Sequence, residues 1–264
     1  MIRSALFSLS LLFAATAFGA SGYERVLIPV WTYNLPGAFG SRWVAQLTGV
    51  NTSVEQAAVK TFPGIVCGFQ PCPGDPGYVF AWRLDGSDDF TRGRFLYVTQ
   101  GRADDLQFSL LAFDSSRMNA SFGSQVPVVR EREFSNRSIV LSNVPLAQGF
   151  RIGLRIYGHQ NRPMPVTIRI ERSGLLEYVP WQVQLEPYPN IPQGDDSRPS
   201  FALIDVNALL PANFMTDPPF NPFPGPGPAL LTIRVSPVSS QDFIWAFVTV
   251  THDETQHFTA IGPQ

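Results

Sequence analysis

The residue pattern along most of the chain is that of short β-strands separated by turns. From residue 25 onward, apolar residues alternate with polar ones or gather in short runs rich in Val, Ile, Phe, Thr and Trp, and Gly, Pro, Asn or Asp bounds the runs. This pattern predicts strands at 25–31, 42–51, 57–62, 77–83, 94–100, 106–113, 138–144, 150–157, 165–171, 178–186, 200–206, 229–236, 243–251 and 256–261. No long window has a helical period, although Ser53–Lys60 and Asn207–Leu210 each suit a short helical turn. The sequence therefore predicts an all-β fold.

Two pairs of segments resemble each other. The segment 25–51 resembles 137–158, and the hairpin-like run 95–112 resembles 245–261. Two degenerate copies of one sandwich would explain both similarities, and chance likeness between amphipathic strands is the alternative. The two pairs differ in spacing, so the second copy would carry insertions.

We therefore predict two antiparallel β-sandwich domains of immunoglobulin-like character. The first spans 22–118, a connector spans 119–133, and the second spans 134–264 with a proline-rich loop at 211–228. Proline lacks the N–H that a β-ladder needs, so this loop is expected outside the sheets. Alternating charge in Arg130-Glu-Arg-Glu133 predicts an exposed edge strand in the connector. A single larger domain of two sheets is the alternative.

The first twenty residues have the pattern of a secretory signal peptide. Arg3 precedes an apolar run from Ala5 to Ala15, and small residues that follow supply cleavage sites. Segment 1–20 is therefore expected to direct the chain to the periplasm or the medium. No later segment reaches the roughly 18 uninterrupted apolar residues of a membrane helix, so no membrane span is predicted.

Net charge bears on the class of binding partner, and cysteine content bears on disulfide bonding. The formal net charge is -2, and neither sign forms a long run. This balance gives no electrostatic argument for binding nucleic acid. Cys67 and Cys72 are the 2 cysteines, and in an exported chain they predict a local disulfide.

Motifs of the common secreted hydrolases are absent from the sequence. The chain contains neither Gly-x-Ser-x-Gly nor His-Glu-x-x-His. His252 and His257 are candidate metal ligands, because a turn at 253–256 would set them opposite each other across a hairpin. A solvated turn is the alternative. We predict no catalytic residue and no cofactor.

The aromatic residues offer one candidate ligand surface. Most of the tryptophans lie within alternating strand runs, where burial is expected. These are Trp43, Trp82, Trp181 and Trp245. Trp31 and Tyr33 precede an Asn-Leu-Pro-Gly turn and are the better candidates for an exposed surface.

The segments Ser116–Phe134 and Trp245–Ile261 are similar to patterns in secreted proteins of soil bacteria, notably acidobacteria. Those proteins form a family of secreted all-β proteins without known function. The resemblance covers most of the chain beyond the predicted signal peptide. It implies bacterial export and a β-sandwich, and it implies no catalytic or binding residues.

The sequence thus favours a secreted, non-catalytic module for adhesion or protein interaction, with a protein or glycan partner at the cell exterior. A carbohydrate-binding module is one alternative, which a coplanar pair of exposed Trp or Tyr rings would favour. A secreted hydrolase with dispersed carboxylates is another, which two acids ~5 to 9 Å apart in a deep cleft would favour.

Overall fold

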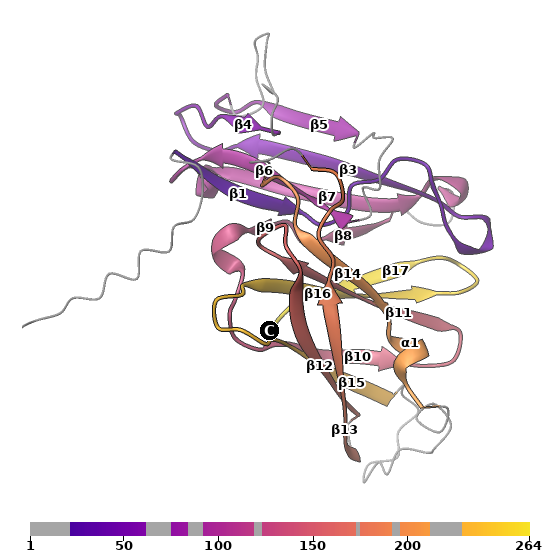
Figure 1. The fold of residues 1–264 in the computed structure, drawn as a ribbon. Coiled ribbons are helices and arrows are strands. Elements are labelled where there is room, and N and C mark those ends of the chain that lie inside the picture. The colour runs from indigo at the N-terminus through magenta and orange to yellow at the C-terminus, as the bar shows by residue number, and fades with distance from the viewer. Residues whose placement is uncertain are drawn as a thin grey trace, which may run out of the picture.

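A computed structural model describes residues 22–61, 75–83, 92–118, 123–172, 175–191, 196–211 and 229–264. These residues form antiparallel β-sheets packed together, which confirms the all-β prediction (Figure 1). Every predicted strand segment contains a strand. The predicted signal peptide 1–20, the predicted disulfide between Cys67 and Cys72, and residues 212–228 of the proline-rich loop lie outside the described residues.

Two sheets form the N-terminal half. The β1 sheet has the order β4 (Val59–Lys60), β6 (Arg94–Thr99), β1 (Tyr23–Ile28) and β9 (Val129–Arg130). The β3 sheet contains β3 (Arg42–Asn51), β7 (Leu106–Asp114) and β8 (Ser124–Val126). At its other edge, β2 (Leu35–Pro36) and β5 (Val79–Arg83) both pair with β3.

Two further sheets form the C-terminal half. The β12 sheet has the order β10 (Ile139–Leu146), β15 (Ala229–Pro237), β12 (Met164–Arg172) and β13 (Leu175–Leu185). The β11 sheet has the order β14 (Ser200–Asp205), β11 (Phe150–Gly158), β16 (Ile244–His252) and β17 (Phe258–Ile261). A single turn of helix, α1 (Val206–Leu209), follows β14 as predicted.

The two halves share one strand order. In the first half β4-β6-β1 lie in one sheet and β5-β3-β7-β8 in the other. In the second half β12-β15-β10 and β14-β11-β16-β17 occupy the same places in the same chain order. The strands β2 and β9 of the first half and β13 of the second have no counterpart. The predicted likeness of 25–51 to 137–158 therefore pairs equivalent strands. The predicted likeness of 95–112 to 245–261 does not, because β6 and β7 lie in different sheets whereas β16 and β17 form one hairpin.

The immunoglobulin-like part of the prediction is not confirmed. In an immunoglobulin constant domain the first two strands pair within one sheet. Here β1 lies in one sheet and β3 in the other, while β1 pairs with β6. The same holds for β10 and β11 in the second half.

The predicted connector 119–133 completes the first half. Its described residues supply β8 and β9, which are the edge strands of the two N-terminal sheets. Beyond β9, Glu131–Glu133 form a 3-10 turn, so the prediction of an exposed edge strand at Arg130–Glu133 is wrong. The Nε of Arg25 donates to the Glu131 carboxylate at 2.9 Å, and both residues are buried. Glu131 tolerates burial because a charge on the neighbouring strand pairs with it.

The segment Ser53–Lys60 also departs from its prediction. It runs through bends into the short strand β4 and contains no helical turn. Val59 and Lys60 instead pair with β6, where Val59 joins the core.

The β11 sheet is buried on both faces. Ile152, Leu154 and Ile156 point into the core shared with the β12 sheet. The alternate side chains point the other way, and the aromatic ones join the core of the N-terminal half. These are Tyr157, Phe201, Trp245, Phe247 and Phe258. Since β8 and β9 lie at the boundary between the halves (Figure 1), this aromatic face closes the open edge of the first sandwich.

Tyr157 is the deepest contact of this closure. Its side chain is fully buried, its ring stacks on Phe247, and its hydroxyl donates to the Pro29 carbonyl at 2.7 Å. Burial raises the pKa of Tyr157 to about 12, although the nearby Arg155 guanidinium opposes part of that shift.

We expect this tyrosine to make the fold sensitive to alkali. Below pH 10 the hydroxyl is protonated in both states, but between about pH 10 and 12 the unfolded chain loses the proton more readily, so stability falls. The free energy of unfolding, measured with urea at pH 9 and pH 11, should drop by about 1 kcal/mol more in the wild type than in Tyr157→Phe. The exposed Tyr33→Phe serves as control and should leave the wild-type drop in place; an equal drop in Tyr157→Phe would contradict this account.

Candidate functional site

The structure separates the two residues of the predicted aromatic surface. Trp31 is 7% exposed, belongs to the core of the N-terminal half, and lies under the Arg94 guanidinium, whose carbon is 5.6 Å from its ring centroid. It therefore offers no open ring face to a ligand. Tyr33 is 49% exposed.

The predicted metal ligands His252 and His257 lie opposite each other as expected, but the His252 ring is engaged in contacts within its own turn and with Phe150. The amide of His252 donates to the His257 carbonyl at 2.9 Å, which closes the β16–β17 turn. The Nδ1 atom of His252 accepts a hydrogen bond from the Thr255 amide at 3.2 Å, and its ring packs edge-on against Phe150. Among the described residues, no group of three His, Cys, Asp or Glu side chains is arranged to hold a metal ion.

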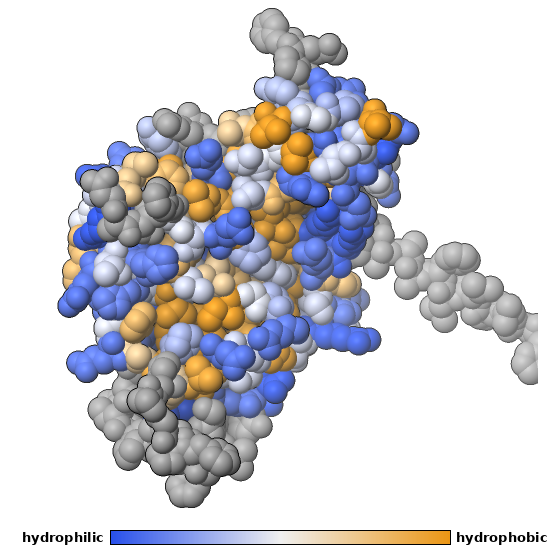
Figure 2. Space-filling model, turned by 180° about the vertical axis from the view of Figure 1, so that it is seen from behind, coloured by the Kyte–Doolittle hydropathy of each residue, from blue (hydrophilic) through white to orange (hydrophobic). Residues whose placement is uncertain are grey.

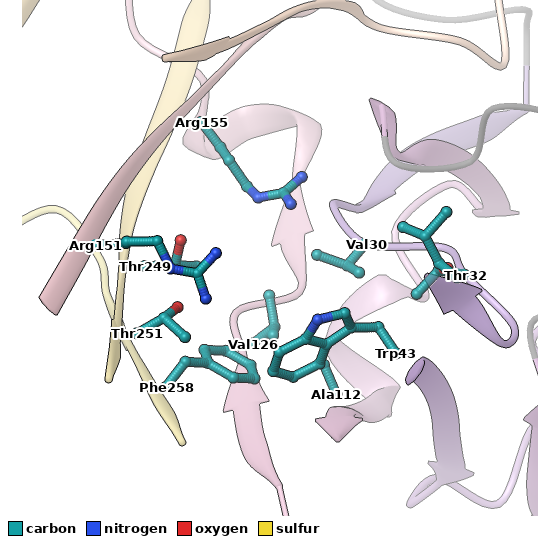
Figure 3. Close-up of a pocket in the computed structure, with 11 residues that line it drawn as sticks. Val30, Thr32, Trp43, Ala112, Val126, Arg151, Arg155, Thr249, Thr251 and Phe258 are labelled. Carbon is teal, nitrogen blue, oxygen red and sulfur yellow. The ribbon is translucent and has the colours of Figure 1, made fainter. Parts of the chain in front are cut away.

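A cavity of about 170 Å³ lies between the two halves and is the strongest candidate site (Figure 3). The N-terminal half lines it with Val30, Thr32, Leu35, Trp43, Ala112 and Val126. The C-terminal half lines it with Arg151, Arg155, Thr249, Thr251 and Phe258. The N-terminal lining is apolar apart from Thr32, and the C-terminal lining is cationic and hydroxyl-bearing apart from Phe258.

The polar wall follows from strand alternation. On β11, Arg151, Gly153, Arg155 and Tyr157 share the face that looks toward the N-terminal half, because side chains two apart lie on one side of a strand. At one end of this face Tyr157 packs against the edge of the first sandwich. At the other end the two arginines line the cavity. The paired strand β16 shows the same change along the same face: Trp245 and Phe247 lie beside the Tyr157 end, and Thr249 and Thr251 lie beside the two arginines.

Gly153 keeps the floor of this wall open between the two arginines. A Cβ at this position would lie 2.9 Å from the Thr249 hydroxyl and 3.7 Å from the Leu203 side chain. The glycine therefore leaves room for the Thr249 hydroxyl, which donates to the Gly153 carbonyl at 3.3 Å.

Arg151 is held in place by three neighbours. Its Nε donates to Asp253 at 2.8 Å and its Nη2 to Gln256 at 2.8 Å, so the β16–β17 turn fixes the guanidinium plane. The guanidinium carbon lies 5.6 Å from the ring centroid of Phe39, a cation–π distance. Figure 3 shows both arginines reaching toward the cavity from the same strand.

Packing and a backbone hydrogen bond support part of the apolar lining. The Trp43 and Phe258 rings meet edge to face with centroids 5.4 Å apart, across the boundary between the halves. The backbone of Thr32 accepts a hydrogen bond from the Ala45 amide at 2.8 Å, which ties the end of the β1 segment to β3. These contacts join the two halves at Trp43 and Phe258 and tie Thr32 to β3.

An exposed loop, residues 33–40, borders the cavity. Tyr33, Leu35 and Phe39 are 49%, 37% and 64% exposed, and Leu35 also lines the cavity. Together with Arg151 we call these three residues the cavity mouth. Figure 2 shows the mixed character of one face of the molecule, where hydrophobic residues lie in patches among hydrophilic ones over both halves.

Asp114 holds this loop in place through Arg117. The Arg117 guanidinium bonds to Asp114 at 2.9 Å and donates to the Phe39 carbonyl at 2.6 Å. Burial alone would raise the pKa of Asp114, but hydrogen bonds from the Arg42 amide, Ser116 and Arg117 outweigh it and lower the pKa below its usual value. The ionised carboxylate is thus the form that holds the loop.

Among the described residues that line the cavity, none is a carboxylate or an imidazole. The polar groups of the described lining are two guanidinium groups and three threonine hydroxyls. A pair of acids of the kind a glycosidase uses is not present in this lining.

Sequence reasoning missed Arg151 and Arg155. The signal was the run Arg-Ile-Gly-Leu-Arg-Ile-Tyr at 151–157, in which arginines alternate with core residues. Such alternation is typical of a strand with a solvated face. It does not reveal that a second sandwich covers that face.

The comparisons with known proteins found no match. No protein-family model matches the chain, and neither a curated protein nor a solved structure does. Within the described residues, no helix is long and apolar enough to cross a membrane.

We expect Asp114→Asn to loosen the loop and to alter the acid sensitivity of the protein. At pH 7 the loss of charged hydrogen bonds should lower the free energy of unfolding by about 1 to 3 kcal/mol. Because the folded pKa of Asp114 is depressed, its contribution is present above the unfolded pKa and lost as pH falls through the folded pKa.

Urea unfolding at pH 7 and pH 3 measures both effects. The gap between wild type and Asp114→Asn should narrow at pH 3. Glu254→Gln, a change at an exposed residue of the β16–β17 turn, is the control and should show no gap at either pH. A constant gap for Asp114→Asn would contradict the assignment.

Proposed function

We propose that this protein is an exported, non-catalytic module that binds a protein partner at the cavity mouth. The observation that carries the proposal is the exposure of Tyr33, Leu35 and Phe39 on one loop beside Arg151. Exposed aromatic side chains next to an arginine are the residue types that dominate the binding energy of protein interfaces.

The conformation of Phe39 supports this proposal. Its φ is 54°, in the left-handed region that is unfavourable for a bulky residue by about 1 kcal/mol or more. Its ring is 64% exposed, so most of its apolar surface is not buried in this chain. An exposed aromatic ring on a strained backbone, whose carbonyl accepts a hydrogen bond from Arg117, is better explained by contact with a partner than by folding.

Export is the second part of the proposal. It rests on the predicted signal peptide at 1–20, with its basic residue, apolar run and small cleavage residues. The periplasm and the medium are both compatible with this leader.

The two alternatives draw less support from the site. Tyr33 is the one exposed residue among the Tyr and Trp side chains that the structure describes, so these residues form no exposed pair for a sugar ring. A hydrolase with paired carboxylates would need acids in the cavity, and its lining contributes arginines instead.

Site-specific photo-crosslinking tests the interaction. A photoreactive phenylalanine analogue is placed at position 39, or at position 54 as a control, since Val54 is 92% exposed and lies beyond the opposite end of β3. The chain is expressed with its leader, irradiated in the envelope and medium fractions, and recovered. We expect a defined protein adduct from position 39 and none from position 54.

The adduct should depend on the mouth as a whole. Tyr33→Ser should reduce its yield about tenfold, the effect of removing one hot-spot side chain. Equal labelling from both positions, or no adduct together with Tyr33-dependent binding on a glycan array, would overturn the proposal, the latter in favour of a carbohydrate-binding module.

A further inference from the structure

We propose that the free edge of β14 binds an extended segment of a partner protein, which adds a fifth strand to the four-stranded β11 sheet. This segment has apolar residues at alternate positions and a basic residue at each end. The strand-binding site is separate from the cavity mouth and does not depend on the interaction proposed there. It rests on the backbone of β14, the side chains around its edge and the charges at the two ends of that edge.

Part of the β14 backbone has no strand beside it. β11 pairs along one side of β14. On the other side, the Phe201 amide donates to the Glu186 carbonyl at 3.0 Å, and the Glu186 amide donates to the Phe201 carbonyl at 3.0 Å. Since successive residues of a strand direct their backbone groups to opposite sides, Leu203 and Asp205 face the same way as Phe201. Among the described residues, no strand pairs with Leu203 or Asp205 on that side.

The edge of the facing sheet leaves β14 at this bridge. β13 pairs with β12 and meets β14 through Glu186, the residue that follows β13. By the same alternation, Gln182 and Gln184 direct their backbone groups away from β12. The edges of the two C-terminal sheets are therefore joined at one residue pair and, within the part of the chain that the structure describes, are not joined beyond it.

Apolar surface accompanies these backbone groups. Four side chains on the two edges reach the C-terminal core but are only partly buried, whereas Leu154 and Ile168 on the inner strands are 0% exposed. The four are Trp181, Val183, Ala202 and Ile204. Leu203 points to the other face of β14 and is 54% exposed. An added strand would cover both faces, because its alternate residues would lie beside Ile204 and beside Leu203.

β14 also lacks the features that protect other edges of this protein. Exposed edges are commonly blocked by proline, by bulges or by short length. β13 carries Pro180 at a position whose backbone faces away from β12, β10 has a register shift between Leu141 and Val144, and β8 and β9 have only 3 and 2 residues. β14 has 6 residues, an unbroken register with β11, and no Pro, Lys or Arg. Such an edge suits addition of a strand.

The charges at the gap favour basic residues in the partner. The segments 180–186 and 200–205 contain two charged residues, Glu186 and Asp205, and both are exposed. Asp205 accepts hydrogen bonds from the neutral amides of Asn207 and Ala208, and among the described residues neither carboxylate has an ion pair. Arg155, which pairs with Leu203, lies on the opposite side of β14 from the free edge. A segment with a basic residue at each end complements these carboxylates.

Fluorescence anisotropy of labelled peptides tests the site on the purified chain. The probe is acetyl-Lys-Thr-Val-Thr-Val-Thr-Lys-amide. The first control is the same peptide with its five central amides N-methylated, which removes the donors that a β-ladder needs, and the second has Glu at both ends. We expect saturable binding of the probe, binding at least about tenfold weaker for the N-methylated peptide, and binding a few-fold weaker for the Glu-ended peptide.

Variants of one residue assign the binding to β14. Leu203→Pro removes the amide that faces the free edge and breaks no bond to β11, so the chain should fold and bind the probe at least about tenfold more weakly. Leu203→Thr keeps this amide and should change the affinity by less than about threefold. Leu230→Thr, at an exposed position of β15, should leave the affinity unchanged. If Leu203→Pro does not fold, the comparison of the two Lys-ended peptides still decides.

Amide hydrogen exchange gives a second readout at the same residue. In the free chain the Leu203 amide should exchange faster than the amides of Ala202 and Ile204, which face β11. The probe should slow exchange at Leu203, and the N-methylated peptide should not. Protection of Leu203 equal to that of Ala202 in the free chain would show that this edge is already paired, and the proposal would be wrong.

Three further results would overturn the proposal. These are absence of saturable probe binding, equal affinity for the N-methylated peptide, and wild-type affinity in a folded Leu203→Pro variant. A dimer that Leu203→Pro dissociates, measured by sedimentation, would also overturn it, because a second copy of the chain would then fill the edge. None of these measurements involves position 39, so failure of the strand-binding site and failure of the interaction at the cavity mouth are distinguishable.

Discussion

The structure depends on the double burial of the β11 sheet. One face of this sheet forms the C-terminal core with the β12 sheet, and the other carries aromatic side chains into the core of the N-terminal half. The first sandwich ends at the short strands β8 and β9, and an uncovered edge of that kind exposes apolar surface and unpaired backbone. The rings of Tyr157, Trp245 and Phe247 cover it, so the N-terminal core is incomplete without the second half.

The same face generates the candidate site. Its aromatic end packs tightly against the N-terminal half, whereas its other end bears Arg151, Gly153 and Arg155 and leaves a cavity. The mouth of that cavity is a strained loop whose carbonyl at Phe39 is held by Arg117 and, through it, by Asp114. The closure of the first sandwich and the cavity therefore lie at two ends of one sheet face, and strand alternation decides which residues contribute to each.

The sequence located the longer strands but missed the short strands β2, β8 and β9 and the outer contacts of the sheets. Alternation and turn residues depend on local chemistry, so every segment predicted as a strand contains one. The missed strands are only two or three residues long, too short to show an alternation. Burial of Trp31 and Glu131 depends on Arg94 and Arg25, which pack against them from other segments, and no local pattern reports such contacts. The sequence contained one sign that the second half covers the first. The strand β16 begins with Ile-Trp-Ala-Phe-Val, and such a run without a polar residue is typical of a strand buried on both faces. The alternating arginines of β11 carried no comparable sign of the cavity.

Hydrogen exchange of two neighbouring variants tests the closure most directly. Phe247 and Val248 are adjacent on β16 but point into different cores, so Phe247→Ala and Val248→Ala each create a cavity on one side of the sheet. The account predicts that Phe247→Ala accelerates amide exchange in β1, β6, β8 and β9 of the N-terminal half, whereas Val248→Ala accelerates it in β11 and β12 and leaves the N-terminal half protected. Unchanged protection of β8 and β9 in Phe247→Ala would contradict the dependence of the first sandwich on the second.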